Sequence, residues 1–229
     1  MCRHALPPRG RRADLPWPPP ANQPRPADGA QRAAAPIVNG CEYSSDLGVP
    51  SVHIDNAAAS ADAIEHLVGL GHRRIGVVTG PEISPISRDR LAGAIDAATR
   101  AGLRDSLHIR VGDYSAGPAV DQTRDLLAQD VTAIFCFSDE MAMGALSAIG
   151  DAGLSCPKDV SVIGFDDLPL ARYFQPPLTT IAQPKAMIGR RTVELLVDIL
   201  RGVDSPSRQV TLDHELIVRG STAQPASAR

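Results

Sequence analysis

The sequence predicts an α/β fold in which a doubly wound parallel sheet is covered by helices on both faces. From Pro50 onward, short apolar β-like runs alternate with helical segments, which is the order of serial βαβ units. Three helical segments end in a glycine (Gly71, Gly102 and Gly153) of the kind that stops a helix. Aromatic residues make up only 3% of the 229, so aliphatic side chains must form the core, as is common in parallel sheets between helices.

Each element can be placed from its residue pattern. The strands are short apolar runs bounded by turn residues, and the helices carry apolar residues at helical spacing, such as Ala119, Thr123 and Leu127. In chain order we expect strands at 51–54, 75–79, 108–111, 133–137 and 161–165, alternating with helices at 58–70, 88–101, 116–128 and 139–152.

The last third of the ordered chain is predicted to leave this sheet for a second layer. A β-like run at Leu178–Ile181 follows two prolines, and a helix follows at Pro184–Arg201. Two more β-like runs, 208–212 and 215–219, are too few for a normal domain. The apolar positions of the helix therefore need a partner surface, and we expect an exposed apolar face that drives self-association. These positions are Ile188, Leu195, Leu196 and Ile199.

The N-terminal segment differs from the rest in composition. Residues 1–36 hold nine of the 20 prolines and few large apolar side chains, which predicts disorder. Residues 1–40 carry a net charge of +4, which leaves −7 for the remaining 189 residues. A body that acidic is a poor surface for nucleic acid, because phosphate contacts need clustered Lys and Arg.

Composition also indicates the compartment. The four cysteines have no CxxC spacing, which favours reduced thiols. No run approaches the ~20 apolar residues of a membrane span, and the N-terminal prolines and arginines stand where a signal peptide would need apolar residues. We therefore expect a cytoplasmic protein.

Asp166 is the most informative candidate for a binding residue. It follows the apolar run 161–165. Burying an unpaired charge in an apolar strand costs free energy, so the carboxylate is expected at the solvent-facing end of that strand. In an open parallel sheet, ligands bind at the carboxyl ends of the strands. The residues that this rule places at that edge are Gly80, Pro81, Asp113, Ser138, Asp139, Asp166 and Asp167, with Ser84, Ile86, Ser87 and Arg90 from the connection 80–90.

These side chains favour a neutral, hydroxyl-rich small molecule. Polar groups of both signs surround an apolar floor of strands, and a carboxylate or an arginine can hold two hydrogen-bonding groups of one ring. Local roles stay open at this stage: Asp139 as a helix N-cap, Asp166 as a cap or local ion pair, Arg90 as a solvated helix residue and Phe135 as core.

Signals for catalysis are weak. The sequence has no GxSxG, no GxxxxGK[ST] and no GxGxxG after a strand. The histidines lack the spacing of a metal site or a catalytic triad, and Asp166-Asp167 resembles a magnesium pair only in isolation. We expect no catalytic residue, no metal and no cofactor.

Several motifs in series resemble the effector-sensing half of LacI/GalR-family bacterial transcriptional repressors. They are VPSVHIDN (49–56), GHRRIGVVTGP (71–81), RLAGA (90–94), SDEMAMGAL (138–146), DVSVIGFDDLPLARYF (159–174), PPLTTIAQP (176–184) and ELIVRGST (215–222). Within that family, CEYSSDLGVPSVHIDN (41–56) and LTTIAQP (178–184) are most similar to the cytidine repressor branch.

The resemblance implies a periplasmic-binding-protein-like fold of two α/β lobes with the ligand in the cleft. It places the family's ligand arginine on Arg90 and its effector-contacting acid on Asp166. In purine-sensing relatives, further contacts fall on Ser84 and Ile86, where those relatives carry Arg and Thr, so the resemblance does not imply purine recognition. The other implied ligand-binding positions are Phe135, Ser138, Ser84 and Ile86.

The family's helix-turn-helix and hinge helix are expected to be absent, because residues 1–40 contain no capped pair of amphipathic helices. One lobe is then complete and the other partial, and DNA contact would need a head that this chain does not encode. The expected division is a disordered tail over 1–40, a remnant of the N-terminal lobe over 41–56, the effector-binding lobe over 57–177, a return segment to the N-terminal lobe over 178–222 and a flexible tail over 223–229.

The expected function is that of the sensing domain of a transcriptional regulator, which binds a nucleoside or sugar and acts by lobe closure, as a homodimer in the intact family. A solute-binding protein that feeds a sugar transporter is the alternative. A processing enzyme at the same sheet edge is the third and weakest hypothesis, since nothing in the sequence supplies its catalytic groups.

Overall fold

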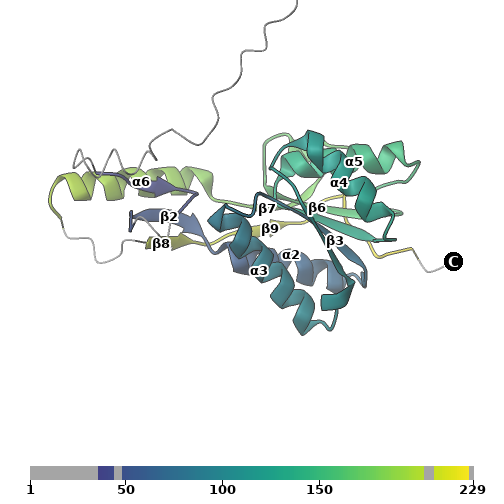
Figure 1. The fold of residues 1–229 in the computed structure, drawn as a ribbon. Helices are drawn as coiled ribbons and strands as arrows, with labels where there is room; N and C mark the ends of the chain where they lie inside the picture. Colours follow the sequence, from purple (N-terminus) through teal and green to yellow (C-terminus); the bar gives the residue numbers. More distant parts are fainter. Residues whose placement is uncertain (1–35, 44–47, 204–208, 227–229) are drawn as a thin grey trace, which may run out of the picture. The chain divides into compact units, whose positions relative to one another are not determined.

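The computed structural model describes residues 36–43, 48–203 and 209–226, and it contains two β-sheets (Figure 1). The larger sheet has six strands in the order β4-β3-β5-β6-β7-β9, all parallel except β9. These strands are β3 (Ile75–Thr79), β4 (Leu107–Val111), β5 (Ala133–Cys136), β6 (Ser161–Asp166), β7 (Thr179–Ala182) and β9 (Glu215–Ile217).

Helices cover both faces of the six-stranded sheet. α2 (Asn56–Gly69) and α3 (Pro85–Arg100) pack against each other on one face, and α4 (Ala116–Leu127) and α5 (Asp139–Asp151) do so on the other (Figure 1). The order reverses between β3 and β5, because the chain moves outward from β3 to β4 and then returns to the other side of β3. The predicted doubly wound α/β fold is confirmed.

The smaller sheet is parallel and has three strands, in the order β1-β2-β8. These are β1 (Asn39–Gly40), β2 (Ser51–Ile54) and β8 (Gln209–Leu212), and α6 (Lys185–Leu200) packs on β1 and β2. Ile188 and Leu195 of α6 are buried, and Leu196 and Ile199 are half-buried. The expected apolar face of this helix is therefore largely covered, and its exposed large apolar side chains are Met187, Val193 and Leu200.

Two predictions about which sheet the later strands join are wrong. The run expected to leave the first sheet is β7, which pairs with β6 in the six-stranded sheet. Its Thr179, Thr180 and Ile181 are fully buried, so the strand needs the large core, and a three-residue 3₁₀ helix (Ala171–Tyr173) replaces a full crossover helix before it. β9 also lies in that sheet, which leaves only α6 and β8 of the segment 178–222 with the three-stranded sheet.

Residues 1–35 of the predicted disordered tail, 1–40, lie outside the described residues. Its last two residues, Asn39–Gly40, form β1 and pair with Ser51 and Val52 of β2, which contradicts the prediction at this end. Residues 227–229 of the predicted C-terminal tail also lie outside the described residues. The remaining expected strands and helices are present, with ends that move by three residues or fewer.

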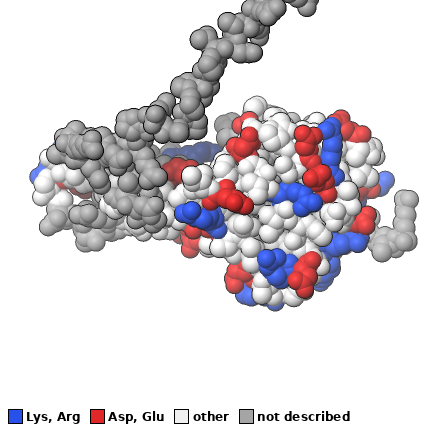
Figure 2. Space-filling view, viewed as in Figure 1, with Lys and Arg blue, Asp and Glu red and all other residues white. Residues whose placement is uncertain are grey.

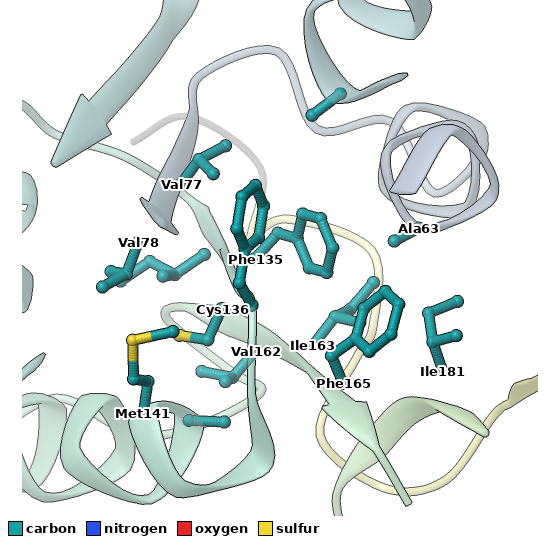
Figure 3. Packing of buried hydrophobic residues seen from close by; sticks show 14 of the residues in the cluster. Ala63, Val77, Val78, Phe135, Cys136, Met141, Val162, Ile163, Phe165 and Ile181 are labelled. Atoms are coloured by element: carbon teal, nitrogen blue, oxygen red, sulfur yellow. The ribbon is translucent and has the colours of Figure 1, made fainter. Parts of the chain in front are cut away.

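Aliphatic and phenylalanine side chains form one core on both faces of the six-stranded sheet. Successive residues of each strand point to opposite faces, so Val77, Phe135 and Phe165 face α2, while Val78 and Cys136 face Met141 of α5 (Figure 3). Phe135 lies between Phe137 and Phe165, with ring centroids 5.3 and 6.5 Å away. This packing gives the carboxyl ends of the strands a rigid base.

The helix ends follow the sequence signals. Gly71, Gly102 and Gly153 have φ values of 100°, 71° and 71°, which is the left-handed conformation expected of a glycine that stops a helix. At the start of α5, the Ser138 hydroxyl accepts a hydrogen bond from the Met141 amide at 3.1 Å, so Ser138 is the N-cap and Asp139 is free for another role. No described helix is both long and apolar enough to cross a membrane.

His72 is a buried histidine that makes stability depend on pH. It hydrogen-bonds to Thr132, Ser161 and the Ala223 carbonyl, and burial lowers its pKa below the ordinary value of 6.5. Below pH 6.5 the unfolded chain therefore binds more protons than the folded chain, and the free energy of unfolding falls as the pH drops.

We expect the free energy of unfolding of the wild type to fall towards that of His72→Gln as the pH drops below 6.5, by up to about 1 kcal/mol per pH unit. Urea unfolding of both proteins at pH 7.5, 6.5 and 5.5 measures this difference. His66, whose pKa is also lowered by burial, titrates in both proteins, and its charge is one of the causes that lower the pKa of His72. An advantage that stays constant from pH 7.5 to 5.5 would contradict this role of His72.

Candidate functional site

A cavity of about 410 Å³ lies at the carboxyl ends of the parallel strands, within the size range of small-molecule sites. Its lining residues follow β1, β4, β5 and β7, end or follow β6, or stand on the helix after β3, so the cavity lies at the sheet edge where ligands of parallel sheets bind. They are Cys41, Glu42, Ile86, Arg90, Tyr114, Ser138, Glu140, Asp166, Leu168, Gln183 and Lys185.

Arg90 is held rigidly at the floor of this cavity. Its side chain is on α3 and only 3% exposed, and its guanidinium carbon lies 3.5 Å from the centre of the Phe165 ring. Nε donates to Asn56 Oδ1 at 2.8 Å and Nη1 donates to the Phe137 carbonyl at 2.6 Å. No hydrogen bond to another described residue uses Nη2, which leaves donors for a ligand.

Burial lowers the pKa of Arg90, and the negative charge of Asp166 opposes that shift. The reciprocal effect holds at Asp166, where burial raises the carboxyl pKa and the charge of Arg90 lowers it. The two groups stabilise each other's charged forms without a direct ion pair in the described structure. A buried cation and a half-buried anion thus face one cavity with hydrogen-bonding capacity left over.

Asp166 ends β6 in an unusual backbone conformation. Its φ is 108° and that of Asp167 is 47°, which turns the chain sharply at the strand end. Gln183 Nε2 donates to Asp166 Oδ1 at 2.6 Å, and Lys185 Nζ donates to the main-chain carbonyls of Asp166 and Asp167. The acid predicted from the sequence therefore reaches the cavity from a turn held by the segment that follows β7.

Sequence reasoning missed Tyr114, which lines the cavity beside Ser138. Tyr114 has a φ of 70°, its hydroxyl hydrogen-bonds with the Ser87 hydroxyl, and its carbonyl accepts from Ser138 Oγ at 3.3 Å. Its neighbour Asp113, named at this edge from the sequence, is exposed and accepts from the amide and hydroxyl of Ser115. Tyr114, the residue after Asp113, therefore lines the cavity, whereas the Asp113 carboxylate is bound by Ser115.

Two lining residues, Cys41 and Glu42, come from the chain just after β1 of the smaller sheet. Burial is the main cause that raises the pKa of both side chains. No local pattern could have located them, because their place depends on how the two sheets meet. Gln183 and Lys185 were missed because β7, which they follow, was expected to leave the six-stranded sheet.

Of the six predicted ligand-binding residues, the cavity brings together Arg90, Asp166, Ser138 and Ile86. It does not include the other two among its described lining residues. Phe135 is fully buried in the core, and Ser84 caps α3 by accepting from the Ser87 amide at 3.4 Å. Among the remaining edge candidates, Asp167 pairs with Arg219 at 2.7 Å, and Asp139 is fully buried behind the site.

The described residues offer no group of three or more His, Cys, Asp or Glu side chains that could hold a metal ion. The face shown in Figure 2 has Lys and Arg interspersed with Asp and Glu over the six-stranded body, without a continuous basic surface. The cavity is lined by charged, hydroxyl and apolar side chains, which can hold a polar small molecule.

Comparison with known proteins agrees with this geometry. Residues 64–222 match the family model described as a periplasmic binding protein-like domain. The HTH-type transcriptional repressor CytR of Escherichia coli K12 is 44% identical over 196 residues, which are 84% of this chain and 57% of that protein. This chain thus spans little more than half the length of that relative.

Two solved structures of regulators have the same fold. A LacI-family transcriptional regulator from Enterococcus faecium with bound ribose superposes with a TM-score of 0.80 at 27% identity, covering 86% of this chain and 74% of that chain. A LacI-family regulatory protein from Chloroflexus aggregans superposes with a TM-score of 0.76 at 34% identity, covering 85% and 71%. The chain therefore belongs to the periplasmic binding protein-like family, in its branch of LacI-type transcription regulators.

Proposed function

We propose that this chain is the effector-sensing part of a cytoplasmic LacI-type regulator and that its cavity binds a nucleoside or sugar. The observation that carries the proposal is the convergence of the buried Arg90 and the half-buried Asp166 on a cavity of about 410 Å³ at the strand ends. Both can form paired hydrogen bonds with a ring or its hydroxyl groups. Ser138 and Ile86 contribute a hydroxyl and an apolar wall.

The charges of the cavity favour an uncharged ligand. Glu42, Glu140 and Asp166 oppose the two cations Arg90 and Lys185, and Lys185 already donates to two main-chain carbonyls. A phosphorylated compound would bring its charge towards carboxylates with no free basic cluster to receive it. A neutral nucleoside or sugar meets no such repulsion.

In a regulator of this kind, effector binding would change the equilibrium between lobe arrangements and thereby the affinity for DNA, since both ligands act on one conformational equilibrium. The relatives found by comparison are transcription regulators, which favours this role over a solute-binding protein for transport and over an enzyme. We assign no DNA contact to the described residues. Homodimerisation belongs to the same proposal.

A thermal-melt screen tests the proposal with cytidine, adenosine, ribose and cellobiose against the wild type and Asp166→Asn. A matching effector at about one hundred times its Kd stabilises the folded chain by about 2.7 kcal/mol, which should raise Tm by about 5 to 10 °C. Asp166→Asn should lose most of that rise, because an amide places a donor where the cavity needs an acceptor.

Asp105→Asn is the control, since Asp105 is exposed on the 3₁₀ helix 104–106 and does not line the cavity. It should respond to the effector like the wild type. A full response in Asp166→Asn would contradict the position of the site, and a wild type that no compound stabilises would contradict the proposed ligand class.

A further inference from the structure

We propose that Asp139 is a positioning residue for effector binding, which holds the turn at Asp166–Leu168 so that Asp166 and Leu168 face the cavity. Asp139 lines no part of the cavity and would not touch the effector. The inference rests on the proposed function, since it assigns Asp139 to that same site.

The Asp139 side chain hydrogen-bonds to two separate segments of the chain, the turn at 166–168 and β7. Its side chain is fully buried at the start of α5. Oδ2 accepts a hydrogen bond from the Leu168 amide at 2.6 Å, and Oδ1 accepts from the Thr180 hydroxyl at 2.5 Å. The Thr180 hydroxyl in turn accepts from the Asp167 amide at 3.4 Å. Both amides of the turn that follows Asp166 are therefore held by this pair.

The turn needs these hydrogen bonds because its backbone conformation is unfavourable by itself. Asp166 and Asp167 are successive non-glycine residues with positive φ, a conformation that side chains penalise. A strained turn persists only where surrounding contacts over-determine it. Lys185 binds its carbonyls and Asp139 with Thr180 binds its amides, so the turn is held from both sides.

The core is shaped around the Asp139 carboxylate. A Cβ at Gly164, on β6, would lie 2.3 Å from Asp139 Oδ1, so the glycine makes room for this oxygen. Burial raises the pKa of Asp139 to about 6, while the hydrogen bonds from Thr180 and Leu168 oppose that shift. The charges of Asp166 and Asp167 raise the pKa further, and the charge of Asp139 in turn helps to raise the pKa of Cys136. Burial disfavours the charged form of this carboxylate, and Ser138 already caps the helix, so the presence of Asp139 points to a function beyond capping.

The test compares two pairs of variants. Asp139→Asn removes the negative charge and one of the two acceptor oxygens that bind Leu168 and Thr180. Asp151→Asn is its control, the same substitution at the exposed end of the same helix. Thr180→Val removes only the hydroxyl and keeps the shape, whereas Thr180→Ser keeps the hydroxyl and should restore wild-type behaviour. The Thr180 pair keeps the test valid if Asp139→Asn does not fold.

The first readout needs no effector. Hydrogen exchange of the Asp167 and Leu168 amides, followed by NMR at pH 7.5, should accelerate about tenfold or more in Asp139→Asn and Thr180→Val, because a lost bond to a charged group exposes these amides. The Leu168 amide proton of the wild type should also shift as the pH passes about 6, and this step should be missing in Asp139→Asn. Unchanged exchange in both variants overturns the proposal.

The second readout is a Kd. The ligand is whichever of cytidine, adenosine, ribose and cellobiose stabilises the wild type in the thermal-melt screen, and its Kd is measured well below the Tm of each variant. Asp139→Asn and Thr180→Val should weaken binding about tenfold, and Thr180→Ser and Asp151→Asn should not. A role in stability alone would lower Tm and leave Kd unchanged, which would overturn the proposal. If the wild type binds none of these compounds, the proposed function fails, and the exchange measurement alone decides whether Asp139 holds the turn.

Discussion

Replacing Gly93 by alanine is expected to destabilise the chain by about 2–4 kcal/mol, because overpacking a rigid contact forces backbone to move. Gly93 is buried on α3 where that helix meets α2. A Cβ there would lie 2.0 Å from the Ala57 carbonyl oxygen and 2.6 Å from its carbonyl carbon. These are backbone atoms of α2, so no side chain can rotate away and the two helices must separate.

Gly150→Ala is the matched control. Gly150 also lies in a helix, α5, but a Cβ there would have no neighbouring atom within 4 Å. Alanine is the better helix former, so this variant should be as stable as the wild type or more stable by up to about 1 kcal/mol. Urea unfolding of the three proteins gives both differences. A Gly93→Ala chain within about 0.5 kcal/mol of wild type would show that the α2–α3 contact is looser than described.

Arg90→Lys is expected to abolish the effector-induced rise in Tm and to lower the free energy of unfolding by about 3 kcal/mol. Lysine keeps the charge at a position that is only 3% exposed. It cannot donate to Asn56 and the Phe137 carbonyl in the planar geometry of the guanidinium, nor lie flat on the Phe165 ring. Buried acceptors and a buried charge are then left poorly satisfied.

The measurement is urea unfolding without effector and the thermal-melt screen with effector. Arg88→Lys controls for the substitution itself, because Arg88 lies two residues earlier on the same helix with its side chain exposed. It should behave like the wild type in both assays. An Arg90→Lys variant that keeps the full effector response would remove Arg90 from the binding site, whatever its effect on stability.

The elements of the six-stranded sheet as far as β6 could be predicted from the sequence because their signals are local. Apolar runs, helical spacing and the glycine stops each depend on a few neighbouring residues, and all of them correspond to elements of the structure. The place of Asp166 followed from one local fact, a carboxylate after a buried strand. The resemblance to LacI-type regulators also rests on the sequence alone, and the comparisons confirm it.

Local patterns failed where a strand or a side chain is placed by distant partners. β7 reads like any short apolar run, and only its pairing with β6 and the burial of Thr179 and Thr180 put it in the large sheet. β1 is two residues long and exists because β2 lies beside it. Such short strands carry little propensity of their own, so non-local pairing decides them.

The sequence by itself determined the fold class, the family and the edge of the sheet that holds the cavity. Tertiary structure alone decided that Tyr114 and Glu42 line this cavity, that Phe135 belongs to the core, and that Asp139 is buried behind the site. The physical reason is that side-chain roles depend on which groups meet in space. Asp139 finds its two donors 29 and 41 residues further along the chain, and no spacing rule connects them.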